Sequence, residues 1–287
     1  MGKSTLVNSI VGTKVAVTSD KPQTTRRAIR GIANGELEGE RWQLVLVDLP
    51  GVQRPRDPLT ERMQGLVERQ LGECDAILFV VSGIETVGAG DRFIAKALAS
   101  SPSPVIAAVN KVDALDRGGT VAALDATARL EQEGVTLQDV FPISARTGAG
   151  LDPLLQSLVR KLPEGPLYYP DEARSDMRQE LAIAELVREQ ALARTREEVP
   201  HSVEVEVQEI ADRDGLTEIK ATLWVETQSQ KGILIGKQGA MIREIGTGAR
   251  SEIERLLGAH VFLDLTVKLR KGWRRDEGLL DRLGIEA

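Results

Sequence analysis

The first 165 residues or so alternate short apolar runs with longer segments of helical character, and this alternation constrains the fold more than any other feature. Four apolar runs end in polar loops and are typical of buried strands: RWQLVLVDLP, CDAILFVVSG, SPVIAAVNKVD and DVFPISA. Helical patterns cover 58–73, 90–101, 120–134 and 151–162. Such alternation predicts a doubly wound, mostly parallel sheet, which binds ligands beyond the carboxyl ends of its strands.

A Gly-Lys-Ser-Thr sequence, Gly2 to Thr5, stands before a further segment of helical character. The free N–H groups and the dipole of a helix N-terminus favour a phosphate group. We expect Lys3 to reach the β- and γ-phosphates of a nucleotide and the Ser4 hydroxyl to ligate Mg²⁺. The motif is a weak signal on its own, because these four residues arise by chance in many chains.

A second motif, Asp-Leu-Pro-Gly, follows the first of the apolar strands. Asp48 is placed to hold Mg²⁺ through water, and the Gly51 N–H to sense a γ-phosphate. The preceding DKPQTTRR segment offers Thr25 as a second metal ligand, with Thr24 as the weaker candidate. The residues assigned to the nucleotide site from this part of the chain are Thr25, Asp48, Leu49, Pro50, Gly51 and Val52.

Two more polar loops complete a guanine-nucleotide pattern. Asn110, Lys111 and Asp113 belong to NKVD, and Ser144 and Ala145 to SAR. A carboxylate at the position of Asp113 accepts hydrogen bonds from N1–H and the exocyclic amine of guanine, a donor pair that adenine lacks. The Ala145 N–H is expected to meet guanine O6. Each loop alone could be a simple polar turn, but four in this order, each at the end of a strand or the start of a helix, predict a GTP or GDP site with Mg²⁺.

The position after Gly51 bears on hydrolysis. Val52 stands where Ras-like proteins carry the glutamine that positions the attacking water. We therefore name no catalytic residue and expect slow intrinsic GTP hydrolysis that depends on a monovalent cation, a partner or a backbone-held water.

Basic residues concentrate in 231–275, which holds ten Lys or Arg and four Asp or Glu. This segment carries +6 in a chain of net charge −6, so the remainder carries −12. A basic patch inside an acidic protein is typical of a polyanion site, although charge alone would also fit a solvated surface.

Within this basic segment, Gly236 to Gly239 form a GxxG sequence between two helical patterns. Such a turn lets the backbone approach a single-stranded sugar-phosphate chain, with flanking apolar residues forming a groove for bases. Met241, Ile242 and Ile245 are expected to pack in the core rather than to serve as platforms for bases. Trp273 is expected to pack against the domain, with stacking on a base as the alternative. The predicted RNA-binding residues are Lys231, Gly236, Lys237, Gln238, Gly239, Arg243 and Arg250, with Lys268, Arg270, Arg274 and Arg275 as weaker phosphate contacts.

The second half of the chain has the element order helix-strand-strand-helix-helix-strand, which predicts a small α+β domain. A segment rich in proline and turn residues, LPEGPLYYPDEARSD, separates it from the first half. We predict an α/β GTPase domain over 1–165, a linker over 166–176, an RNA-binding domain over 177–275 and a C-terminal tail over 276–287.

The chain resembles the Era family of bacterial ribosome-assembly GTPases. The resemblance rests on PQTTRR, NKVD, EVPHSVEV, QKGILIGKQGAMIREIG and LDLTVKLRKGW, and it covers essentially the whole chain. It implies a P-loop GTPase domain followed by a type II KH domain. It also implies binding to the 3′ end of small-subunit ribosomal RNA, a role in 30S subunit maturation, and a cytoplasmic protein partly associated with the inner membrane surface. We expect a monomer.

Two departures from the family pattern stand out. Leu49 replaces the usual threonine of Asp-Thr-Pro-Gly. The family also has a strand and Gly-x-Pro-Asn-Val before Gly-Lys-Ser-Thr, and in related GTPases that asparagine helps hold a monovalent cation. We expect that Met1 is not the natural start, and that the 287-residue chain binds GTP poorly through an unstable first domain.

Two other functions compete with a GTPase whose nucleotide state controls RNA binding. One is a non-enzymatic RNA-binding assembly factor whose nucleotide domain is inactive, which a GTP-binding measurement would separate from an enzyme. The other is a KH-bearing protein with two GTPase domains, and the single nucleotide domain argues against it.

Overall fold

The computed structural model of the chain describes residues 1–18, 25–52, 55–196 and 199–285. Its contacts divide the chain into two compact units, each built from three segments. The first unit gathers Met1–Ala16, Ile29–Asp48 and Val67–Asp176, and the second gathers Val17–Ala28, Leu49–Leu66 and Met177–Ala287. Two early segments thus pack with the C-terminal half of the chain, and the domain boundaries given above stay predictions.

Three parallel strands form the larger sheet of the first unit. They are β3 (Ile77–Ser82), β4 (Val105–Asn110) and β5 (Leu137–Pro142), hydrogen-bonded in that order. Every residue of β4 is buried, as expected for a central strand covered on both faces. The parallel sheet predicted from the strand-helix alternation is confirmed.

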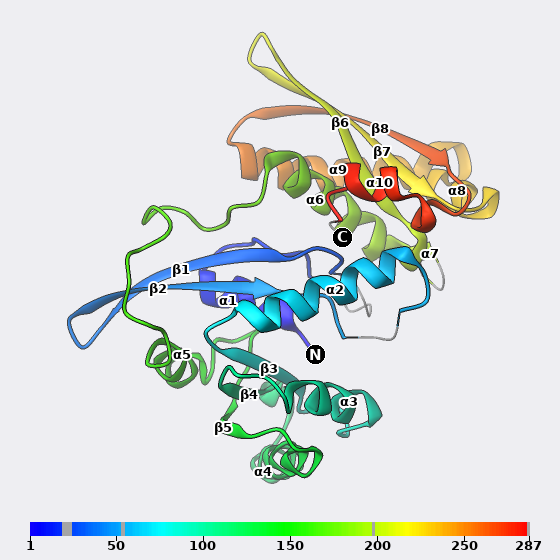
Figure 1. Cartoon of the computed structure of the whole chain (residues 1–287). Helices are drawn as coiled ribbons and strands as arrows, with labels where there is room; N and C mark the ends of the chain where they lie inside the picture. The colour runs from blue at the N-terminus through cyan, green and yellow to red at the C-terminus, as the bar shows by residue number, and fades with distance from the viewer. Residues whose placement is uncertain (19–24, 53–54, 197–198, 286–287) are drawn as a thin grey trace. The chain divides into compact units, whose positions relative to one another are not determined.

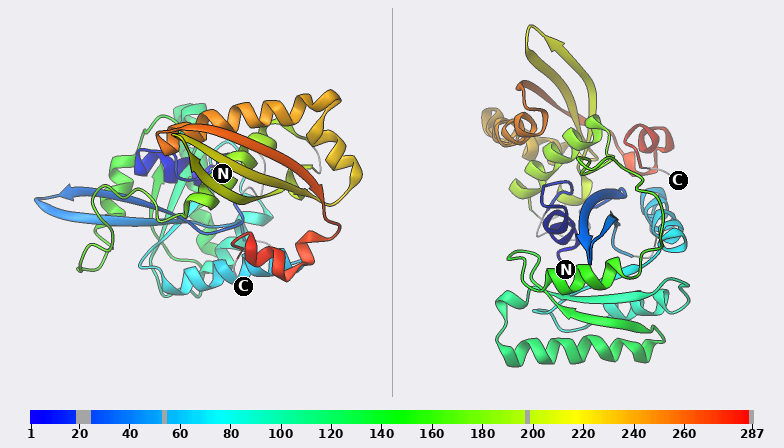
Figure 2. Two further views of the ribbon diagram at one scale, coloured as in Figure 1. Left: turned by 90° about the horizontal axis from the view of Figure 1, so that it is seen from above. Right: turned by 90° about the vertical axis from the view of Figure 1, so that its left-hand side faces the viewer.

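Helices cover both faces of this sheet (Figures 1 and 2). Val80 of β3 packs with Leu154 of α5, whereas its neighbour Phe79 packs in a second cluster with Ala95 of α3. Successive side chains of a strand point to opposite faces, so these clusters lie on the two sides of the sheet. Four helices lie wholly within the first unit as described: α1 (Lys3–Val11), α3 (Ala89–Leu98), α4 (Arg117–Ala128) and α5 (Leu151–Val159).

One strand of the first unit was not predicted. β1 (Ile29–Leu37) pairs antiparallel with β2 (Glu40–Asp48) in a separate two-stranded sheet. Gly31 and Gly35 interrupt its apolar pattern, and glycine weakens a strand. Both are used for close packing: a Cβ at Gly31 would lie 2.8 Å from side chains of α1, and one at Gly35 only 2.3 Å from the ring of Trp42.

The second unit is built on a sheet of order β6–β7–β8. β6 (Glu204–Arg213) and β7 (Leu216–Val225) are antiparallel, while β7 and β8 (His260–Leu269) are parallel. Helices α6 (Gln179–Arg194) and α9 (Ala240–Leu257) lie on one face of the sheet and share its largest hydrophobic cluster (Figure 1). With α8 (Gln228–Ile235) between β7 and α9, the order matches the predicted type II KH topology.

The predicted C-terminal tail forms a packed helix, α10 (Glu277–Arg282). Leu279 and Leu280 are fully buried in a cluster with Trp273 and with side chains from the start of α2 (Pro58–Glu73). Trp273 has no exposed surface, and its Nε1 donates to the carbonyl of Ser202, in α7 (Val199–Ser202), at 3.0 Å. The expectation that Trp273 packs against the domain is confirmed, and α2 has the predicted bounds.

Among the residues that the structure describes, no helix combines the length and the apolar character required to cross a membrane.

Candidate nucleotide and RNA sites

The Gly-Lys-Ser-Thr motif lies at the N-terminus of α1. Gly2 caps the helix in the left-handed conformation, with φ 88° and ψ 30°, which favours glycine. A Cβ on Gly2 would lie 2.6 Å from Nδ2 of Asn110, so a side chain would not fit there. Lys3–Thr5 form the first turn, whose N–H groups have no acceptor within an α-helix. The predicted phosphate-binding residues therefore stand where an anion is favoured.

Two predicted Mg²⁺ ligands lie against each other. The Ser4 hydroxyl donates to Oδ2 of Asp48, the last residue of β2, at 2.5 Å. The side chain of Asp48 is buried, with 2% of its surface exposed. A hydroxyl and a carboxylate oxygen are hard ligands of the kind that Mg²⁺ prefers in nucleotide sites. The residues present at this point therefore fit the metal ion.

The other predicted phosphate and metal residues of this region belong to the second unit. Thr25 is buried, with 9% of its surface exposed, and Thr24 lies outside the described residues. Leu49–Val52 follow Asp48 directly. A Cβ on Gly51 would meet no atom within 4 Å, so the space beside its backbone is open. The roles of Thr25 and of 49–52 stay predictions.

Asn110 joins three loops of the first unit. Its Nδ2 donates to the carbonyl of Met1 at 2.9 Å, and its Oδ1 accepts from the N–H groups of Lys111 at 2.8 Å and Ala145 at 2.9 Å. The NKVD loop is thereby fixed to the start of α1 and to the loop after β5. The Ala145 N–H, which we expected at guanine O6, donates to this asparagine, and its role toward guanine stays a prediction.

Asp113 has both carboxylate oxygens engaged. Ser144 Oγ donates to Oδ1 at 2.6 Å, and Arg146 Nη2 donates to Oδ2. The Ser144 hydrogen bond, followed by that from Arg146, holds the pKa of Asp113 below the ordinary value of an aspartate. These hydrogen bonds therefore favour the ionised carboxylate, the form that accepts hydrogen bonds. Arg146 is the last residue of the SAR motif, but sequence reasoning gave its side chain no role.

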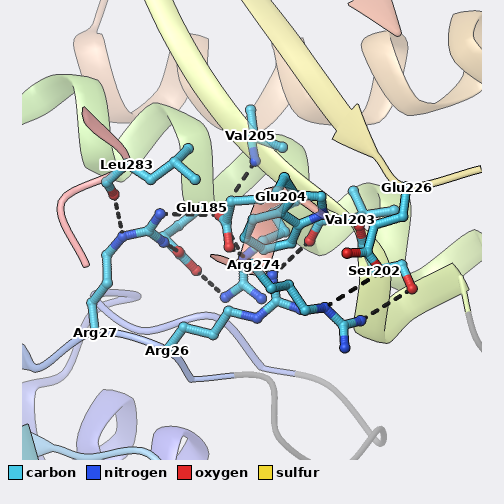
Figure 3. A network of polar contacts seen from close by, with 12 residues as sticks. Arg26, Arg27, Glu185, Ser202, Val203, Glu204, Val205, Glu226, Arg274 and Leu283 are labelled. Carbon is cyan, nitrogen blue, oxygen red and sulfur yellow. Dashed lines mark hydrogen bonds and ion pairs between the residues drawn. The ribbon is translucent and has the colours of Figure 1, made fainter. Parts of the chain in front are cut away.

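A buried ionic cluster fixes the residues that follow Thr25. Arg26 and Arg27 have only 4% and 6% of their side chains exposed. Glu204, fully buried at the start of β6, accepts from Arg26 Nη1 at 2.7 Å and from Arg27 Nη2 at 3.0 Å. Glu185 of α6 forms a further ion pair with Arg27 (Figure 3). These contacts join the segment that carries Thr25 to α6 and β6.

The charge of Glu204 is maintained by its neighbours. Burial alone raises the pKa of Glu204, but the nearby Arg27, Arg26 and Arg188 outweigh burial and hold that pKa well below its ordinary value. Sequence reasoning missed this cluster, because Arg27 and Glu204 are 177 positions apart and no local pattern links them.

The GxxG sequence forms a tight turn between α8 and α9. Gly236 has φ 72° and Gly239 φ 75°, and a Cβ on Gly236 would lie 2.8 Å from the backbone N of Met241. Gln238 is also left-handed, with φ 52°, and its carbonyl accepts from Arg243 Nη1 at 2.8 Å. The turn therefore needs glycine at both ends and is held from α9 by Arg243.

The remaining predicted RNA residues differ in their surroundings. Lys237, Gln238, Arg243 and Arg250 are exposed, and Lys231 is half-buried. Arg270 pairs with Asp276 and Arg274 bonds Ser202, so both are engaged within the second unit. Met241, Ile242 and Ile245 pack with the core cluster, as expected.

Comparisons with known protein families match both halves of the chain. Residues 1–111 match the family described as 50S ribosome-binding GTPase, and residues 198–274 match the family described as KH domain. The GTPase Era of Mycobacterium sp. strain KMS is 46% identical over 289 aligned positions, which cover 99% of this chain and 94% of the relative. The GTPase Era of Mycobacterium bovis strain BCG / Pasteur 1173P2 is 45% identical over 290 positions, with the same coverage.

Two solved structures are similar over the full length. One is Era in complex with MgGDPNP and nucleotides 1506–1542 of 16S ribosomal RNA, at 35% identity and a TM-score of 0.92. The other is an Aquifex aeolicus Era variant bound to GDP·AlF4⁻, at 35% identity and a TM-score of 0.91. Each comparison covers 100% of this chain and 95% of the solved chain.

Proposed function

Because this chain belongs to the GTPase Era family, we propose that it binds and hydrolyses GTP, binds the 3′ end of small-subunit ribosomal RNA and assists maturation of the 30S subunit. The observation that carries the proposal is the full-length similarity to Era bound to both MgGDPNP and 16S ribosomal RNA. The geometry described above supports it, since one chain holds a helix N-terminus with metal-type ligands and a GxxG turn.

The nucleotide would lie along the loops at the carboxyl ends of the strands. We assign the phosphates to Gly2–Thr5, with the Lys3 ammonium on the β- and γ-phosphates and the Gly51 N–H on the γ-phosphate. We assign guanine to Asp113, with Asn110 fixing the surrounding loops.

The site residues also fit Mg²⁺. Ser4, Asp48 and Thr25 would hold the ion, Ser4 and Asp48 lying in contact in the structure. Held by these residues, Mg²⁺ would supply positive charge against the negative charge of the phosphates. A monovalent cation is a further proposed component. Val52 has no side-chain amide to orient water as a glutamine would, so we assign no catalytic residue and expect slow intrinsic turnover.

The RNA would bind along the GxxG turn. Backbone N–H groups at the start of α9 and the exposed Lys237 favour a phosphate, and the lack of side chains on Gly236 and Gly239 permits close approach. From its ribosomal partner we propose a cytoplasmic location. A monomeric state and a peripheral association with the inner membrane are proposals from the family resemblance.

A substitution at Asp113 tests the guanine site. Asp113→Asn should sharply weaken GTP binding and favour xanthosine triphosphate, because xanthine offers a C2 carbonyl to the new amide. Competition binding with the two nucleotides measures this, together with phosphate release from GTP with Mg²⁺ and with EDTA. An unchanged preference for GTP would remove Asp113 from the site.

A charge reversal in the GxxG turn tests the RNA site. Lys237→Asp with Gln238→Asp places two carboxylates on exposed positions, so the fold should persist while binding of a single-stranded oligonucleotide matching the ribosomal RNA 3′ end is lost. Lys96→Asp with Gln132→Asp makes the same charge change on exposed positions of the first unit. Fluorescence anisotropy that shows equal loss in both variants would argue against a site at the turn.

A further inference from the structure

The first turns of α2 are held by C-terminal residues of the same unit. Leu59, Arg62 and Met63 stand at positions i, i+3 and i+4, which lie on one side of a helix. Leu59 and Met63 are buried in a cluster with side chains of α10 and of the residues that flank it. We call residues 273–285, which supply these contacts, the C-terminal clasp. The clasp fixes the helix that follows residues 49–52.

Arg62 forms the polar part of this contact. Only 9% of its side chain is exposed, and its guanidinium pairs with Glu277 and Asp281, one turn apart on α10. Its Nη1 also donates to the carbonyl of Ile285 at 2.7 Å. A guanidinium carries five N–H donors in a rigid fork, so one side chain can hold all three acceptors. Arg62 therefore ties α10 and the residues after it to the start of α2.

The segment that carries Thr25 is bonded to the same clasp. Arg27 Nε donates to the carbonyl of Leu283 at 2.7 Å, two positions before the carbonyl that α2 binds. The guanidinium of Arg26 lies over the ring of Trp273, 5.5 Å from its centroid, in a cation–π contact. Within the second unit, one C-terminal stretch thus joins the two segments that are assigned above to Mg²⁺ and to the γ-phosphate.

We propose that the C-terminal clasp is a positioning element for the third phosphate of GTP, and that Arg62 is the positioning residue through which it orders the segment of Gly51. The proposal rests on the γ-phosphate contact assigned to the Gly51 N–H. The held arrangement leaves that backbone open, because a Cβ on Gly51 would meet no described atom within 4 Å. A segment that is already ordered loses less conformational entropy when a ligand binds to it.

GTP and GDP should respond differently to this ordering. The two nucleotides share the base, the ribose and two phosphates, and only GTP brings a γ-phosphate to the Gly51 segment. A change in the clasp therefore alters the ratio of the two dissociation constants, whereas a contact that served stability alone would leave the ratio unchanged. The partners of Arg62 on α10 are largely exposed, and ion pairs of this kind shift an equilibrium by a factor of roughly two to five.

Arg62→Met tests the proposal, because methionine keeps an aliphatic side chain and removes the donors. GDP and the GTP analogue GDPNP are titrated, each with Mg²⁺, into the full-length wild-type chain and the variant. We expect GDPNP to bind the variant roughly two- to five-fold more weakly and GDP to bind it equally well. The matched control is Arg69→Met, which makes the same change at an exposed position two turns further along α2 and should leave the ratio unchanged.

A second variant loosens the clasp from the side of α10. Glu277→Gln with Asp281→Asn removes both charges that face Arg62, at positions that are 62% and 67% exposed, so the fold should persist. The ratio should shift in the same direction as in Arg62→Met but by less, since the carbonyl of Ile285 keeps its arginine. Added to Arg62→Met, the two substitutions should cause no further shift.

Distinct outcomes would overturn the proposal. One is a ratio in Arg62→Met that is unchanged or moves in favour of GDPNP. Another is a shift in Arg62→Met with none in the α10 variant, because Arg62 would then act without the clasp. If the wild-type chain bound neither GDP nor GDPNP, the proposed function itself would fail. Binding of both nucleotides with an equal ratio in all variants would overturn the role of the clasp alone.

Discussion

Replacing Glu204 by glutamine should destabilise the second unit by removing the negative charge shared by buried arginines. Glu204 has no exposed side-chain surface and lies 2.7 Å from Arg26, 3.0 Å from Arg27 and 3.8 Å from Arg188. Glutamine keeps the volume but removes the charge. Arg27 and Arg188 keep Glu185 as a partner, and Arg26 loses the carboxylate that it binds here.

The expected loss in the free energy of unfolding is large for a single isosteric substitution. Breaking a buried ion pair by removing one partner costs about 3–5 kcal/mol, and we expect the lower end because glutamine still accepts a hydrogen bond. For a unit of this size, about 3 kcal/mol corresponds to a fall of about 10 °C in Tm. That is a substantial share of a typical domain stability of about 5–15 kcal/mol.

Urea unfolding followed by tryptophan fluorescence provides the assay, since Trp273 is buried in the second unit beside Arg26. The matched control is Glu209→Gln on the same strand, which breaks an exposed ion pair with Lys220 and should leave stability unchanged. If Glu204→Gln lowers the free energy of unfolding no more than Glu209→Gln does, the buried cluster does not stabilise the unit as argued.

The carboxylate of Glu204 also makes the stability of the second unit depend on pH, and the sign of this dependence is defined. The pKa of Glu204 lies well below the ordinary glutamate value of 4.5 because of its arginine neighbours. A depressed pKa contributes stability above the unfolded-state pKa, and that contribution is lost as pH falls. The stability difference between wild type and Glu204→Gln should therefore be constant near neutral pH and shrink below about pH 4.5. A difference that grows in acid would contradict this assignment.

Three further predictions concern the nucleotide site, the RNA site and the fold. Ser4→Ala should weaken the Mg²⁺ dependence of GTP binding, measured by titrating Mg²⁺ at fixed nucleotide, and an unchanged Mg²⁺ requirement would exclude Ser4 as a ligand. Lys237→Gln should lower RNA affinity and reduce the slope of log K against log salt by about 0.7, as expected for the loss of one phosphate contact to a single strand; an unchanged slope would mean that Lys237 touches no phosphate. Gly35→Ala should lower the free energy of unfolding by about 1–3 kcal/mol in a thermal melt, because its Cβ would clash with the ring of Trp42. Gly65→Ala within α2, where a Cβ would meet no other atom within 4 Å, should be neutral or stabilising.

The elements that could be predicted from sequence are those whose local pattern decides their structure. Helix 58–73 was predicted with its observed bounds, because its apolar residues recur at helical spacing between a proline and a turn. The buried strand β4 was recognised from its continuous apolar run. The polar loops were found because each follows a strand or opens a helix.

The features that were missed depend on contacts between distant parts of the chain. β1 contains two glycines that only the neighbouring Trp42 and α1 explain. The packing of α10 requires side chains from the start of α2, more than 200 positions earlier in the sequence. No local pattern predicts the pairing of Arg27 with Glu204 or of Arg146 with Asp113. From sequence alone, a charged residue is predicted to be solvent-exposed unless its partner is known.

The pairing of Arg27 with Glu204 also has a consequence for the synthesis of the chain. Glu204 follows Arg27 by 177 positions, so at about 5–20 residues per second the arginine emerges roughly 10–35 s before its partner. During that interval the second unit lacks most of its core, and an early segment that presented an apolar surface would be prone to aggregate. The charged side chains of Arg26 and Arg27 are instead hydrated until Glu204 has been synthesised. A nascent chain can thus hold this segment in solution until β6 has been made and then bury it by charge pairing.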